Sequence, residues 1–142
     1  MKREDWVHMP HGAHFIGMSS CRFRLATFVG NYIVSTVGEY VPDLVVLEIF
    51  AKTRGIDLHG KGVERAADFL AQHGPVEIGF GRLYETMVFP ARKATPEEAI
   101  CGCDYRISDY AEVDMEGYND AAAAAQGHDA MCVKWSEIKG VA

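Results

Sequence analysis

The segment CRFRLATFVGNYIVSTVGEY, residues 21–40, constrains the fold most strongly, because Gly30-Asn31 separates two runs of strand-forming residues. A Gly-Asn pair between such runs is typical of a two-residue hairpin turn. We therefore expect an antiparallel β-hairpin over about 21–41 with its turn at these two residues. Val29 then lies opposite Tyr32, and every other opposed pair follows from this register.

Side chains alternate between the two faces of such a ribbon. The face that we expect on the core carries Cys21, Phe23, Leu25, Thr27, Val29, Tyr32, Val34, Thr36, Gly38 and Tyr40. The other face carries Arg22 opposite Glu39, a cross-strand pair of opposite charges worth roughly 0.2–1 kcal/mol. A slip of one residue would bury the arginines, so the pattern favours this register over its neighbours.

The rest of the chain predicts short elements. A strand is expected over Tyr84–Phe89, and His14–Met18 could form another. Helices are expected over 44–54, where a strand is the competing interpretation, over 63–73, at 95–98, and from Asn119 or Asp120 to about Ile138. This order predicts an α+β domain, in which a small antiparallel sheet built on the hairpin has three to four helices packed on one face.

The chain has 142 residues, of which 49% are apolar, so we expect a single domain over 1–142, with 1–12 as a flexible N-terminal segment. The net charge of −6 argues against binding along a nucleic-acid backbone. We find no secretory signal, and no apolar run of the roughly 20 residues that cross a bilayer. We therefore expect a soluble, cytoplasmic protein that makes no membrane contact and keeps its cysteines reduced.

Arg22, Arg24, Arg82 and Tyr84 form the first candidate site. Arg22 and Arg24 are two residues apart, as are Arg82 and Tyr84. This spacing places both side chains of a pair on the same face of a strand. If the later strand joins the sheet near the hairpin, guanidinium forks and a tyrosine ring would surround one spot that suits a phosphate or carboxylate with a stacked base. The alternative is that Arg22 pairs with Glu39, Arg82 pairs with Glu85, and all of them lie on a solvated face.

Cys101, Cys103, His128 and Cys132 form the second candidate site. Three sulfur ligands and one imidazole nitrogen suit tetrahedral zinc, provided that the C-x-C pair meets the helical pair. The alternative is burial, because His128 and Cys132 also belong to an apolar stripe of the last predicted helix.

His8, His11 and His14 form a third cluster, which could hold a metal or perform acid–base chemistry on a phosphoester. The alternative is a frayed, solvated terminus. The segment GKGVER, residues 60–65, lacks the Ser or Thr that a phosphate-binding loop needs after its Lys. We assign no catalytic residue, and the sequence gives an enzyme little support.

Three segments carry a resemblance: HFIGMSSCRFRLATFVGNYIVSTVGEYVPD, GRLYETMVFP and GYNDAAAAAQGHDAMCVKW. Across roughly residues 11–136 the chain resembles a family of small proteins encoded by phages and prophages. The resemblance implies the cytoplasm of an infected bacterial cell, where proteins of this size often counter host defence. It carries over no functional residue.

We therefore expect a non-catalytic protein that binds a small anionic, nucleotide-like ligand, and which in a phage would sequester a host immune signal. Because sheet edges in so small a domain invite pairing, we also expect a homo-oligomer. One alternative is an interaction protein that binds a host protein and has a zinc-braced or plain core. The other is a phosphodiesterase that acts on cyclic nucleotides through the N-terminal histidines.

Overall fold

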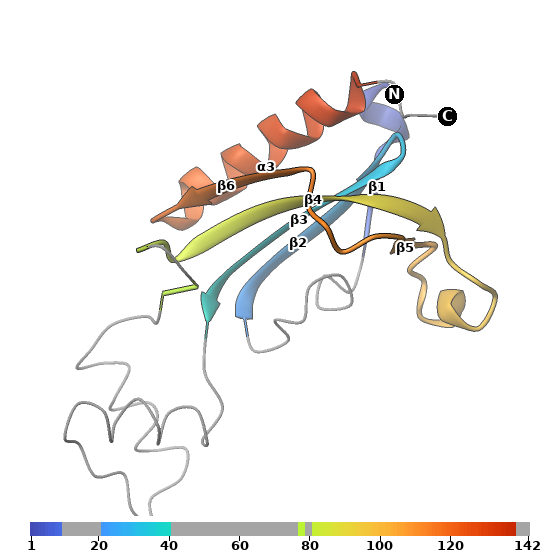
Figure 1. The fold of residues 1–142 in the computed structure, drawn as a ribbon, viewed down its shortest axis with the longest axis horizontal. Coiled ribbons are helices and arrows are strands. Elements are labelled where there is room, and N and C mark those ends of the chain that lie inside the picture. The colour runs from blue at the N-terminus through green and yellow to red at the C-terminus, as the bar shows by residue number, and fades with distance from the viewer. Residues whose placement is uncertain (10–20, 41–76, 79–80, 139–142) are drawn as a thin grey trace, which may run out of the picture.

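The computed structural model describes residues 1–9, 21–40, 77–78 and 81–138. They form a six-stranded antiparallel sheet with a helix laid across one face (Figure 1). The order is β1-β2-β3-β4-β5, and β6 also pairs with β4. The elements are η1 (Arg3–Asp5), β1 (Val7–His8), β2 (Cys21–Val29), β3 (Tyr32–Tyr40), β4 (Tyr84–Lys93), η3 (Glu98–Cys101), β5 (Tyr105–Ile107), β6 (Asp114–Tyr118) and α3 (Ala121–Ser136).

The predicted hairpin is confirmed in position and register. β2 and β3 are joined by Gly30-Asn31, and Val29 lies opposite Tyr32. Gly30 adopts a φ of 61°, a left-handed conformation that costs glycine little. The pairing continues to Cys21 opposite Tyr40, with an irregularity at Glu39 that is described below.

The predicted strand at Tyr84 is also confirmed, and it extends as β4 to Lys93. This strand pairs with β3 along one edge and with two short strands along the other. Its first half pairs with β6, and its last three residues pair with β5. Neither β5 nor β6 was expected from the sequence pattern.

The predicted fold class is wrong, because the described part of the protein is mostly sheet. Its single α-helix is α3, and the helix expected at 95–98 is instead the short 3-10 turn η3. The helices expected over 44–54 and 63–73 and the strand expected over His14–Met18 lie outside the described residues. The sequence predicts too few strands because β5 and β6 are short and polar. Pairing with β4 stabilises them more than their own residue preferences do.

α3 begins as the sequence predicts. The Asp120 side chain accepts a hydrogen bond from the Ala123 backbone N–H at 2.7 Å and so caps the helix. The helix covers the predicted core face of the hairpin (Figure 1). The core on this side contains Trp6, Val29, Tyr32, Val34, Val88, Met131 and Cys132.

A second core lies on the opposite face, which the sequence analysis left as the polar side of the hairpin. Near the turn this face is buried, and Phe28 stacks on Tyr105 of β5 with ring centroids 3.7 Å apart. The cluster contains Met9, Ala26, Phe28, Ile33, Phe89, Cys103 and Ile107. The hairpin is therefore apolar on both faces near its turn and exposes its arginines only at the far end.

Two apolar side chains of the described N-terminal residues 1–9 pack into the two cores. Trp6 is buried on the α3 side, and Met9 is buried on the opposite side. Arg3 pairs with Asp129 of α3, and its guanidinium carbon lies 4.5 Å from the Trp6 ring centroid. Of the helices in the described ranges, none is long and apolar enough to cross a membrane.

Candidate functional site

Arg22 and Arg24 lie on one face of β2, near the end of the sheet remote from the hairpin turn. Both side chains are exposed. Arg24 is opposite Val37, which is itself opposite Glu85 of β4, so these three residues form a row on the face away from α3. The structure therefore places two guanidinium groups on a shared surface at this end of the sheet.

Tyr84 does not join them. Tyr84 lies opposite Gly38, which pairs with Phe23, and this row is on the α3 face. The Phe23 and Tyr84 rings meet edge to face with centroids 5.2 Å apart. The sheet therefore separates the predicted arginine pair from the predicted tyrosine.

Arg82 has a partner of its own, Asn119. With the Asn119 amide turned so that its nitrogen donates to the Gly81 carbonyl, its oxygen accepts from Arg82 Nη1 at 3.2 Å. The aliphatic part of Arg82 covers Gly117 of β6, where a Cβ would lie 2.7 Å from Arg82 Cγ. Arg82 thus holds the start of β4 against the end of β6.

Glu39 departs from the expected pairing with Arg22. Its φ is 54°, and it is the one non-glycine residue with positive φ among the described residues. Its carboxylate oxygen Oε2 accepts a hydrogen bond from the Tyr84 hydroxyl at 3.0 Å. Burial and this contact raise the pKa of Tyr84. Glu39 is therefore engaged by Tyr84 and leaves Arg22 without the predicted partner.

Other described arginines contact carboxylates. The ion pairs are Arg3 with Asp129, Arg92 with Glu98 and Arg106 with Glu98. The hydrogen bond from Arg92 is the main reason that the pKa of Glu98 falls to about 2. In contrast, neither Arg22 nor Arg24 forms an ion pair with any residue that the structure describes.

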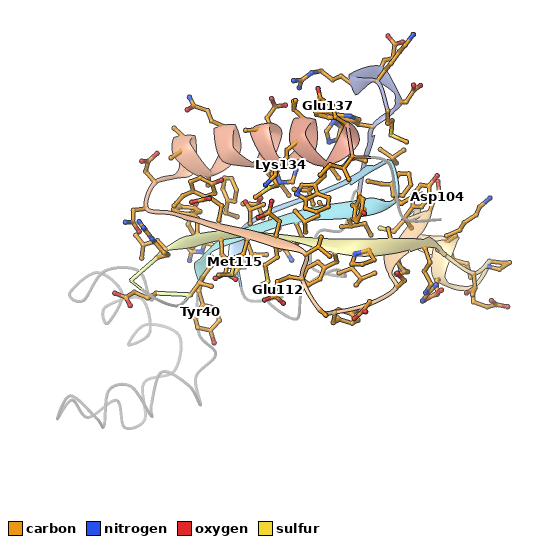
Figure 2. The ribbon with its side chains drawn as sticks, turned by 45° about the horizontal axis from the view of Figure 1, so that its top comes forward. Tyr40, Asp104, Glu112, Met115, Lys134 and Glu137 are labelled. Atoms are coloured by element: carbon orange, nitrogen blue, oxygen red, sulfur yellow. The ribbon has the colours of Figure 1, made fainter. Side chains whose placement is uncertain are left out.

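Glu85 is the acid in the row of Arg24. Figure 2 shows Glu112 and Met115 on the side of the sheet away from α3, the side on which Glu85 also lies. Burial and the charge of Glu112 raise the pKa of Glu85. Glu85 forms no ion pair with Arg24, and no described acid pairs with that arginine.

The predicted zinc set is split between the two cores. Cys101 and Cys103 belong to the cluster on the face away from α3, whereas Cys132 belongs to the cluster beneath α3. Burial raises the pKa of Cys132 to about 12. No group of three or more His, Cys, Asp or Glu side chains in the described ranges is placed to hold a metal.

For His128 and Cys132, the alternative to zinc binding was burial in the core, and this interpretation agrees with the structure. His128 and Cys132 are buried on the sheet-facing side of α3, with exposures of 6% and 0%. Of the N-terminal histidines, His8 belongs to β1, and His11 and His14 lie outside the described residues.

His128 connects α3 to two strands of the sheet. Its Nε2 lies 2.9 Å from Thr27 Oγ1, and its Nδ1 lies 2.7 Å from Thr36 Oγ1. Thr27 Oγ1 is also 2.9 Å from His8 Nδ1, and Thr36 Oγ1 is 2.6 Å from Thr86 Oγ1. We call these five residues the histidine–threonine network.

The network is satisfied with a neutral imidazole. Burial, and then the charge of His8, lower the pKa of His128 to about 4. A neutral imidazole has one donor and one acceptor, and each hydroxyl can donate once while accepting another bond. A single direction of donation can therefore run from Thr86 through Thr36, His128 and Thr27 to His8, or the reverse.

The burial of this network limits its chemistry. A general acid or base must reach the atom that gains or loses the proton, and His128 is enclosed between α3 and the sheet. A satisfied buried network fixes side chains in one arrangement. The network is therefore suited to holding α3 on the sheet, and the exposed arginines are the better candidate for contact with a ligand.

The sequence pattern places Thr27 and Thr36 on the core face of the hairpin but does not indicate their role. The available signal was a hydroxyl at these two positions together with a histidine on the apolar stripe of the last helix. Buried polar side chains need partners, and such a combination could have indicated an inter-layer network.

Comparison with known proteins adds no assignment, since no family model, no curated protein and no solved structure matches the chain. The resemblance to phage-encoded proteins stays a prediction.

Proposed function

We propose that the protein binds a small anionic, nucleotide-like ligand through Arg22 and Arg24 without converting it. The observation that carries this proposal is the exposure of both guanidinium groups on one face with no described carboxylate to pair with them. This contrasts with Arg3, Arg92 and Arg106 in the same acidic protein, each of which contacts an acid.

The chemical class of the ligand follows from the donors. A guanidinium presents a planar fork of N–H groups that matches two oxygens of a phosphate or carboxylate. Residues two apart on a strand are separated by roughly 7 Å, so Arg22 and Arg24 can address one phosphate together or two linked phosphates separately. A cyclic dinucleotide, whose two phosphates are separated by sugars, offers the latter spacing.

The predicted contribution of Tyr84 is not part of this proposal, because Tyr84 lies on the other face of the sheet. The ligand is therefore defined by its anionic group rather than by a stacked base. Sequestration of a host signalling nucleotide, in the setting of a phage, is the narrower form of the proposal and is supported by the sequence resemblance alone.

Isothermal titration calorimetry with ADP-ribose, a cyclic ADP-ribose isomer and a cyclic dinucleotide tests the proposal. We expect at least one to bind wild-type protein and to be recovered intact, which separates capture from phosphodiester cleavage. Each charge-assisted hydrogen bond is worth roughly 1.5–3 kcal/mol, so Arg22→Ala and Arg24→Ala should each lower the affinity about ten-fold or more.

Arg92→Ala is the matched control, because it removes an exposed arginine that is already paired with Glu98. It should leave the affinity within about two-fold of wild type, a change of ~0.4 kcal/mol. The absence of binding by folded wild-type protein, or an equal loss in all three variants, would overturn the proposal.

A further inference from the structure

We infer that Glu39 is an internal competitor for Arg22, and that the Tyr84 hydroxyl holds its carboxylate away. This inference rests on the proposed binding of an anion by Arg22 and Arg24, and it adds the device that keeps Arg22 open. Tyr84 is a positioning residue in this account and does not contact the ligand.

The hairpin register determines where the Glu39 side chain would lie if β3 were regular at this residue. Cys21 pairs with Tyr40 and Phe23 pairs with Gly38, so Arg22 and Glu39 are the residues between these pairs. In a regular strand, Glu39 would project to the face opposite that of its two neighbours, which is the face of Arg22. The two charges would then form a cross-strand pair.

The observed geometry places the carboxylate on the other face. Tyr84 is opposite Gly38, and its ring lies directly over that glycine, because a Cβ on Gly38 would be 2.0 Å from Tyr84 Cδ1. The hydroxyl at the end of this ring donates to Glu39 Oε2 at 3.0 Å. The bare Gly38 therefore allows the tyrosine to reach across the strand and bind Glu39.

The backbone of Glu39 carries the cost of this arrangement. A left-handed conformation is unfavourable for a side chain with a Cβ, and such strain persists only where the surroundings compensate for it. The described compensation is a single hydrogen bond from Tyr84, whose side chain is buried. Strain and one hydrogen bond are of similar size, so the alternative pair with Arg22 is close in free energy.

Glu39 therefore has two states of similar free energy, one bound to Tyr84 and one paired with Arg22. With Tyr84 engaged, Arg22 is open to an external anion. Without the tyrosine hydroxyl, Glu39 can relax to a strand conformation and occupy Arg22, so a ligand would first have to displace it. The apparent affinity then falls by the fraction of protein in the open state.

Tyr84→Phe tests this inference, since it removes the hydroxyl and keeps the ring over Gly38. Without ligand, we expect the Glu39 amide–α-proton coupling to change to a strand value and the Arg22 Nε–H resonance to shift. The affinity for ADP-ribose should fall about ten-fold, equivalent to ~1.4 kcal/mol. Tyr84→Phe with Glu39→Gln should restore both the affinity and the arginine resonance.

Tyr105→Phe is the matched control, because it removes the hydroxyl of a second tyrosine, which is half-buried on the face away from α3. It should change none of these readouts. If Glu39 keeps its coupling and Arg22 its resonance in Tyr84→Phe, the inference is wrong whatever the ligand affinity. If both move but wild-type protein binds none of the nucleotides, the internal competition is supported and the proposed function is overturned.

Discussion

His128 Nδ1 lies 2.7 Å from Thr36 Oγ1, which joins the imidazole of α3 to a hydroxyl of the central hairpin. The same imidazole reaches Thr27 through Nε2. A single side chain thus ties the helical layer to two strands, and its protonation state controls whether the contact survives.

The first prediction is that acid destabilises the protein through His128. Its pKa is about 4 when folded against an ordinary 6.5, so the unfolded chain binds the proton more readily between these values. Stability from the neutral imidazole is full above about pH 6.5 and is lost as pH falls towards 4. The difference of about 2.5 pH units, at ~1.4 kcal/mol per unit, corresponds to about 3 kcal/mol.

Urea unfolding at several pH values between about 4 and 7 measures this slope. His128→Gln should be less stable near neutral pH and should lack the part of the slope that belongs to the imidazole. His8→Gln should keep most of the slope, because burial is the larger cause of the lowered pKa of His128 and the charge of His8 is the second. An unchanged slope in His128→Gln would contradict the assignment.

The second prediction concerns Thr36 and Thr86, whose hydroxyl oxygens are 2.6 Å apart. Thr36→Val leaves both His128 and Thr86 short of a partner, so it should cost roughly 1–3 kcal/mol and more than Thr86→Val. The double variant should cost less than the sum of the single variants, because it removes both members of the pair. Additive costs in a double-mutant cycle would show that the two hydroxyls are not coupled.

The third prediction is that Gly38 tolerates no side chain. Gly38→Ala places a Cβ 2.0 Å from Tyr84 Cδ1, and we expect a loss of about 1–3 kcal/mol from overpacking. Gly81→Ala is the comparison, since Gly81 has a φ of +72° but open space around the missing Cβ. It should cost only the backbone strain, about 1 kcal/mol. Thermal unfolding measures both losses of stability. A larger loss for Gly81→Ala than for Gly38→Ala would contradict the described packing.

The fourth prediction orders the cysteines by reactivity. Cys101 is partly exposed, whereas Cys21, Cys103 and Cys132 are at most 2% exposed. Burial also raises the pKa of Cys21, and that of Cys132 to about 12, so little thiolate is present at neutral pH. Iodoacetamide labelling followed by peptide mass spectrometry should find Cys101 modified first. Early labelling of Cys132 in folded protein would refute its enclosure beneath α3.

The fifth prediction is that removing the Ser35 hydroxyl does not destabilise the protein. Ser35 Oγ is fully buried and makes no hydrogen bond with the described residues. Ser35→Ala should therefore be neutral or stabilising by about 1 kcal/mol, because it removes an unsatisfied polar group and little volume. Thermal unfolding should show no decrease in midpoint, in contrast to Thr36→Val.

Local signals in the sequence were sufficient for the hairpin, the start of β4 and the N-cap of α3. Gly30-Asn31 fixes the turn, and the turn fixes every pair of β2 and β3. Asp120 was recognised because an N-cap acts within one helical turn. These features depend on residues close together in the chain.

The remaining features depend on distant partners. β6 becomes a strand because β4 offers an edge, and its own residues, DMEGY, show little strand pattern. The sequence placed Arg22 opposite Glu39, but a tyrosine 45 residues further on draws that glutamate away. The same limit applies to the candidate zinc site. Its cysteines are chemically suitable ligands, but Cys101 and Cys103 lie on the opposite face of the sheet from Cys132.

The core beneath α3 joins Trp6, near one end of the described chain, to Met131 and Cys132 near the other. Translation delivers these residues in that order, so Trp6 leaves the ribosome long before the helix that covers it. The hairpin can form early, yet this core can close only after α3 has emerged. Until then the nascent chain exposes an apolar sheet face, which makes a chaperone or a slow folding phase relevant to its synthesis.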